Sequence, residues 1–120
     1  MADRVTLYAT GSDTYIVTMN VKKECFLERI FAKSDVDINN IEISRIVNSD
    51  TEATENLRTM EIPSNYSGGS NKFLFVSSNA EVNAWRFFAN DVLKVTITLS
   101  SAGSLFIEID GVIYSSAEIT

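Results

Sequence analysis

Two pairs of carboxylates in this sequence have a spacing suited to acid–base chemistry, Asp35 with Asp37 and Glu52 with Glu55. Such a pair can supply a general acid and a general base when its surroundings separate the two pKa values. The chain has no histidine, which excludes serine–histidine and cysteine–histidine catalysis and histidine-bearing zinc sites. Because nothing near either pair indicates a pocket, we expect solvated loop charges, and we expect that the protein is not an enzyme.

The segment "DVDINN" is the candidate for a metal site. Asp35, Asp37 and Asn39 stand at the first, third and fifth positions of a calcium loop, where oxygen ligands would converge on the ion. The glycine expected next falls on Asn40 and the closing glutamate falls on Ile46, which excludes an EF-hand. A looser calcium site is left as the minor alternative, and the expectation is no metal and no cofactor.

Aromatic residues near asparagines suggest a different chemistry, the binding of a sugar. Tyr66 follows Asn65 and Trp85 lies close to Asn83, so that a stacking ring and an amide donor stand together in the sequence. The same aromatic residues at strand spacing are more often core, and we favour the core for Trp85. If exposed, they would equally suit a protein interface. The candidate binding or interface residues are Tyr66, Trp85, Phe87 and Phe88.

Charge and hydropathy narrow the range of partners. Sixteen acidic residues stand against ten basic ones, a formal charge of −6 with a pI near 4.5, which disfavours binding to nucleic acid or to anionic lipid. The basic residues are scattered along the sequence apart from Lys22 and Lys23. There is no apolar run long enough for a membrane helix and no signal region, so we expect a soluble protein made in the cytosol. The single cysteine, Cys25, suits a buried, inert thiol.

Strands are the elements that must position these residues. Apolar and polar residues alternate from Val5 to Thr10, as in a strand with one buried face. The stretch from Glu24 to Lys33 also fits a short amphipathic helix, but no capping signature precedes it and its neighbours are strands, so we favour a strand. Strands are predicted at residues 5–10, 15–21, 24–33, 41–47, 57–62, 72–78, 84–89, 92–99 and 105–110, with another after the Asp110–Gly111 turn.

Small and polar residues predict the connections. Gly11 to Asp13 is expected to turn the chain, residues 72–78 and 84–89 to form a strand pair, and Ser100 to Ser104 to close a hairpin. About eight to ten short strands at regular spacing are typical of an antiparallel sandwich. We therefore predict an all-β fold, an antiparallel two-sheet β-sandwich that is jelly-roll-like, with residues 1–120 as a single domain.

Two segments carry a family resemblance. "FFANDVLKVTITLSSAGSLFIEIDGV" resembles the closing strands of the small β-sandwich virion proteins of tailed bacteriophages, with a turn at Ala89 to Asp91, a small-residue hairpin and an end near Gly111. "CFLERIFAKSDVD" is similar to their central strand. Asn90 replaces the usual glycine of the turn. The resemblance implies a structural protein on a capsid or tail, often a homo-oligomer and without catalysis.

The sequence and the resemblance together give one expected function and one alternative. The expected function is that of a non-enzymatic structural protein of a virus particle, for capsid decoration or in the tail, made in the host cytoplasm and located in the virion. Its partners would be other copies of itself and a larger capsid or tail assembly, with no nucleic acid and no membrane. The alternative is a carbohydrate- or receptor-binding module, for which a sugar is the expected ligand.

Overall fold

The structure is a computed structural model, and it describes residues 3–61, 70–77 and 84–120. Within these residues the chain forms antiparallel strands and short 3-10 turns, which include η1 (Val47–Ser49) and η2 (Thr51–Ala53). The predicted all-β, antiparallel fold is confirmed. The strands are β1 (Arg4–Val21), β2 (Cys25–Phe26), β3 (Arg29–Ser34), β4 (Ile38–Ile46), β5 (Thr54–Glu61), β6 (Lys72–Val76), β7 (Arg86–Phe87), β8 (Val92–Asp110) and β9 (Tyr114–Ile119).

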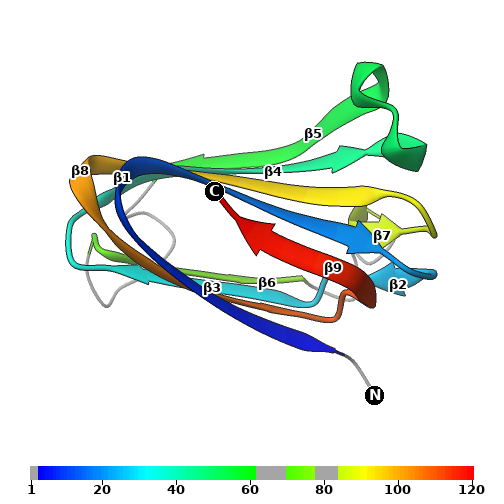
Figure 1. The fold of residues 1–120 in the computed structure, drawn as a ribbon, viewed down its shortest axis with the longest axis horizontal. Helices are drawn as coiled ribbons and strands as arrows, with labels where there is room; N and C mark the ends of the chain where they lie inside the picture. The colour runs from blue at the N-terminus through cyan, green and yellow to red at the C-terminus, as the bar shows by residue number, and fades with distance from the viewer. Residues whose placement is uncertain (1–2, 62–69, 78–83) are drawn as a thin grey trace.

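Two long strands, β1 and β8, form the backbone of the fold. They pair with each other from Arg4 opposite Asp110 to Asn20 opposite Val92, with shifts of register near Ser12. At residues 11–13 the chain changes direction, as predicted, but β1 continues through the bend instead of ending in a turn. The hairpin predicted at residues 100–104 is wrong, because the two halves of β8 pair with β1 and not with each other. The small residues lie where the two paired strands reverse direction together (Figure 1).

The bend divides one hydrogen-bonded sheet into two stacked layers (Figure 1). The β4 layer has the order β5-β4-β8-β1-β9, and it uses the first half of β8 and the second half of β1. In the β3 layer, β6 pairs with β3, β3 with the second half of β8, and that half with the first half of β1. The fold is thus sandwich-like, but the two predicted sheets are a single folded sheet, and a jelly-roll arrangement is not confirmed.

The core lies between the two layers and follows from the alternation of residues along each strand. Val17 and Val95 from the β4 layer and Ile30 and Ile107 from the β3 layer are fully buried and belong to one continuous cluster. Burying one such side chain contributes roughly 1.5–3 kcal/mol. Most of the outward residues on the same strands are polar, charged or aromatic, with aliphatic exceptions such as Ile16, so each layer presents its alternate residues to solvent.

A buried tyrosine fixes the bend of β1 and β8. Tyr15 is 2% exposed, and its hydroxyl donates a hydrogen bond to the carbonyl oxygen of Gly103 at 2.6 Å while accepting one from the backbone N–H of Ser12 at 3.1 Å. A side chain would not fit at Gly103, because a Cβ there would lie 2.6 Å from Asp35 Oδ1 and 2.7 Å from a methyl group of Val36. The bend therefore depends on a hydroxyl group and on the absence of a side chain.

The shorter strands pair differently from the prediction. Residues 72–78 and 84–89 do not form a pair: β6 pairs with β3, and β7 pairs with β2. The segment 24–33 is extended as predicted, but it is divided into β2 and β3. The turn after Asp110 is present, with Gly111 at a φ of 101°, and β9 follows it. Among the described residues, no helix reaches the length and hydropathy needed to cross a bilayer.

Candidate interaction surface

Asp35 and Asp37, which belong to both the acid–base and the calcium candidates, hold connections in place, whereas Glu55 lies within β5. Asp35 Oδ1 accepts a hydrogen bond from the backbone N–H of Ser104 at 2.8 Å, which is the main reason why the pKa of this carboxyl lies below its ordinary value. Asp37 accepts one from Ser70 at 2.6 Å, and Glu55 pairs with Arg45 at 3.2 Å. Over residues 3–61, 70–77 and 84–120 there is neither a pocket nor a group of three potential metal ligands among Cys, Asp and Glu.

The predicted aromatic binding residues do not form one surface. Trp85 is 2% exposed and Phe87 is fully buried, and Trp85 packs on Phe75 with ring centroids 4.6 Å apart. The interpretation of Trp85 as core is confirmed, and neither buried ring can stack on a sugar. Phe88 is 46% exposed and lies against the guanidinium of Arg86. Tyr66 lies outside the described residues.

The structure instead gathers aromatic and cationic side chains on the outer surface of the β3 layer. Alternate residues of its four strands point outward in register, and together they make what we call the aromatic–cationic face. Its residues are Arg4, Thr6 and Tyr8 of β1, Phe106, Glu108 and Asp110 of β8, Arg29, Phe31 and Lys33 of β3, and Lys72, Leu74 and Val76 of β6.

Aromatic rings and cations contact one another across this face. Phe31 and Phe106 meet edge to face with centroids 6.4 Å apart. The guanidinium of Arg29 lies 5.5 Å from the centre of the Phe31 ring, and the ammonium of Lys33 lies 5.7 Å from that of Phe106. Tyr8, directly across from Phe106, is 63% exposed. Tyrosine and arginine are among the residues that contribute most energy to protein interfaces.

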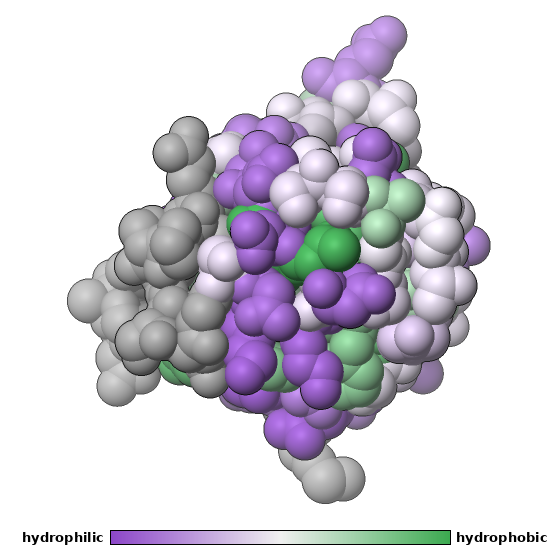
Figure 2. Space-filling model, turned by 90° about the vertical axis from the view of Figure 1, so that its left-hand side faces the viewer, coloured by the Kyte–Doolittle hydropathy of each residue, from purple (hydrophilic) through white to green (hydrophobic). Residues whose placement is uncertain are grey.

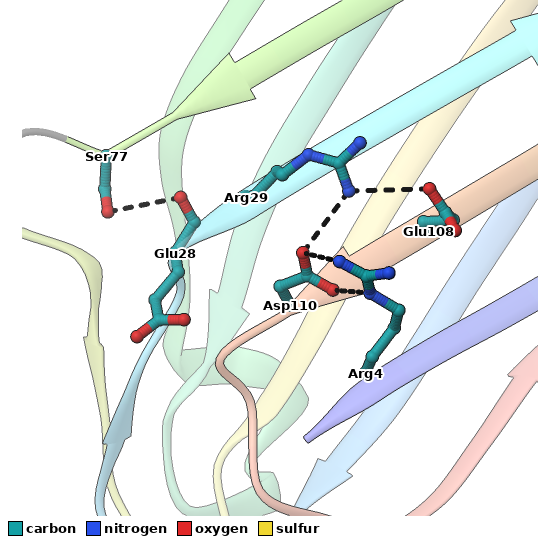
Figure 3. Close-up of polar contacts among 6 residues, drawn as sticks. All are labelled: Arg4, Glu28, Arg29, Ser77, Glu108 and Asp110. Atoms are coloured by element: carbon teal, nitrogen blue, oxygen red, sulfur yellow. Dashed lines mark hydrogen bonds and ion pairs between the residues drawn. The ribbon is translucent and has the colours of Figure 1, made fainter. Parts of the chain in front are cut away.

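An ion network orients one end of the face (Figure 3). Asp110 accepts hydrogen bonds from Arg4 at 2.6 and 3.1 Å and pairs with Arg29 at 3.3 Å, and Arg29 also reaches Glu108 at 3.4 Å. The hydrogen bonds from Arg4, followed by the effect of Arg29, hold the pKa of Asp110 below its ordinary value. The network joins β1, β8 and β3, and it fixes the long arginine side chains before any partner binds.

The charge of the face is opposite to that of the rest of the chain. Four cations and two carboxylates give it a net charge of +2, which leaves −8 on the remainder of a chain whose total is −6. At the bend end of the molecule, hydrophilic side chains dominate the surface and hydrophobic ones emerge only in small patches (Figure 2). The positive charge of the aromatic–cationic face therefore stands against a negative remainder of the chain.

Asp91 and Asn90, in the turn expected at residues 89–91, support the structure around the β2–β7 end. Asp91 is 3% exposed and accepts hydrogen bonds from the backbone N–H groups of Asn48 and Phe88, at 2.9 and 2.8 Å. Asn90 adopts a φ of 74°, a conformation that asparagine tolerates better than most residues, so the replacement of glycine keeps the turn. Cys25 is buried, and burial raises the pKa of its thiol.

In comparisons with known proteins, no family model, no curated protein and no solved structure matches this chain.

Proposed function

We propose that this protein is a non-enzymatic structural component of a virus particle, which docks through its aromatic–cationic face onto an acidic surface of a capsid or tail assembly. The observation that supports a docking role most strongly is the face itself. Three exposed or half-buried rings and four cations lie in register on a rigid, twisted layer of four strands. The virus particle as the location follows from the resemblance of the closing strands to bacteriophage virion proteins.

The physical properties of the face fit a protein partner better than a sugar or a polyphosphate. Arg4 and Arg29 are already neutralised by Asp110 and Glu108, so the face offers oriented arginines and not a strong positive field. A sugar would need amide side chains beside an exposed ring, and the residues of this face include no asparagine or glutamine. A protein surface with carboxylates at its rim would complement Lys33 and Lys72 while its apolar centre covers the rings.

The proposal is tested by sedimentation of virus particles. The tagged chain is supplied during infection, particles are purified on a density gradient, and the chain is quantified by mass spectrometry. The wild type is expected in the particle fraction at a fixed ratio to the shell proteins. Lys33→Glu should reduce that fraction roughly tenfold, because it places like charges together. Lys94→Glu, a reversal on the outer surface of the β4 layer, should not.

Either of two results would contradict the proposal. A wild-type chain that stays at the top of the gradient excludes a particle protein. Equal sedimentation of the wild type, Lys33→Glu and Lys94→Glu with the particles excludes this face as the docking surface. Circular dichroism and thermal unfolding of the variants establish that a loss of binding does not come from a loss of fold.

A further inference from the structure

The first half of β1 forms an open edge of the β3 layer. Residues 4–9 pair with β8 on one side, whereas β9 pairs only with residues 17–21 of β1. Over the part of the chain that the structure describes, no strand lies on the second side of residues 4–9. An edge of this kind exposes backbone N–H and C=O groups that can pair with another strand.

After Arg4, which begins it, this edge lacks the charges that usually protect an edge strand. The six residues from Val5 to Thr10 are uncharged and include no proline. Among the other described edges, β5 contains Glu55 and Arg58 and β9 contains Glu118, whereas β6 likewise begins with a cation and then has no charge. Charged residues and proline are the common means of preventing edge-to-edge pairing.

The direction of the backbone groups follows from one hydrogen bond. The N–H of Gly111, the residue directly after β8, donates to the carbonyl oxygen of Asp3 at 3.0 Å. The backbone N–H and C=O groups of Asp3 therefore point toward the β8 side. Alternate residues of a strand bond to opposite sides. Val5 and Leu7 therefore bond to β8, and Arg4, Thr6 and Tyr8 present their backbone groups to the open side.

From this edge we infer that a second copy of the chain docks on β1, antiparallel and with Thr6 opposite Thr6 on a two-fold axis. That register pairs Arg4 with Tyr8 of the other copy, twice, and it uses the residues whose backbone groups point outward, for about six new ladder hydrogen bonds. The guanidinium beside the tyrosine ring is a favourable cation–π pair, and threonine opposite threonine is a favourable cross-strand pair.

The dimer would join two aromatic–cationic faces into one. Four strands spaced about 4.8 Å apart and five residues long, at about 3.4 Å each, cover roughly 330 Å² of plane, and two such faces cover roughly 650 Å². A standard interface buries roughly 800 Å² per partner, so a single face is small and the doubled face approaches that size. The inference deepens the proposed function, since the docking surface it enlarges is the one proposed above.

Light scattering on a sizing column tests the inference with three variants. The wild type should show twice the chain mass of 13.3 kDa at high concentration and dissociate on dilution. Thr6→Pro removes an outward N–H at the two-fold axis and should give a monomer. Val76→Pro is the matched control, because it places a proline on the opposite edge of the same layer, where the N–H also points outward, and it should remain a dimer.

The exposed Tyr8 gives a test that does not depend on proline. Tyr8→Lys places a cation opposite Arg4 of the other copy and should raise the dissociation constant at least fivefold, whereas Tyr8→Glu should keep or tighten the dimer. A wild type that is monomeric at every soluble concentration, or equal effects of Tyr8→Lys and Tyr8→Glu, would overturn the inference. A monomer that still sediments with particles would overturn the dimer alone, and a dimer that never sediments with them would overturn the proposed function alone.

Discussion

Removal of the Tyr15 hydroxyl tests whether this group stabilises the bend of β1 and β8. The hydroxyl donates to the Gly103 carbonyl at 2.6 Å and accepts from the Ser12 N–H at 3.1 Å, and the ring is 2% exposed. Tyr15→Phe keeps the ring and its packing but leaves both backbone groups without this partner. Groups left unsatisfied in a buried or partly buried site cost about 1–3 kcal/mol of unfolding free energy.

The assay is urea unfolding followed by tryptophan fluorescence, which reports on the buried Trp85. Tyr15→Phe should lower the free energy of unfolding by about 1–3 kcal/mol at an unchanged slope, with a thermal midpoint about 4–12 °C lower. Tyr8→Phe is the matched control, because it removes a hydroxyl from a ring that is 63% exposed, and it should stay within about 0.5 kcal/mol of wild type. If Tyr15→Phe were as stable as this control, the hydroxyl would not hold the bend.

Three further changes have expected outcomes. Gly111→Ala should cost at least about 3 kcal/mol in urea unfolding or abolish soluble expression, since φ is 101° and a Cβ would lie 2.3 Å from the Phe26 carbonyl oxygen. Asp110→Asn should lower the free energy of unfolding at neutral pH, because Arg4 lowers the folded pKa of Asp110 and so stabilises the ionised form in the folded protein. That stabilisation is lost once the carboxylate is protonated, so the difference in free energy of unfolding between Asp110→Asn and wild type should shrink as pH falls below 3.8. The Cys25 thiol, whose pKa burial raises, should react with a disulfide reagent many times more slowly in the native protein than in urea, and equal rates would contradict its burial.

The sequence predicted the class of the fold because alternation of apolar and polar residues is a local signal. It took Ser100 to Ser104 for a hairpin, since small residues serve equally to close a hairpin and to let two paired strands bend together between two layers. What distinguishes the two cases is the pairing of β1 with β8 along their whole length. That pairing joins residues from 72 positions apart, Asn20 and Val92, to 106 positions apart, Arg4 and Asp110, and no local pattern encodes it.

The candidate site was predicted less well than the fold, for a related reason. Arg4 of β1, the β3 pair Arg29 and Lys33, and Lys72 of β6 come from distant parts of the sequence, and only the register of the strands brings them together. Trp85 was a candidate for stacking on a sugar because of its residue type, but the alternation of apolar residues in its short segment already favoured the core. Asp91 gave no signal, because a carboxylate that caps backbone N–H groups looks like any other acidic residue before a strand.

Hydroxyl-radical footprinting of Tyr8, Phe31 and Phe106 tests directly whether the aromatic–cationic face is the docking surface of the protein. Labelling is compared between the chain free in dilute solution and the chain in gradient-purified particles. The reference ring is the exposed Phe88, which follows β7 and does not belong to the aromatic–cationic face. If the face is buried against a partner, the three face residues should be strongly protected in the particle, with little change at Phe88. Equal labelling of the face in both states, with the chain firmly in the particle, would show that the face is not the docking surface.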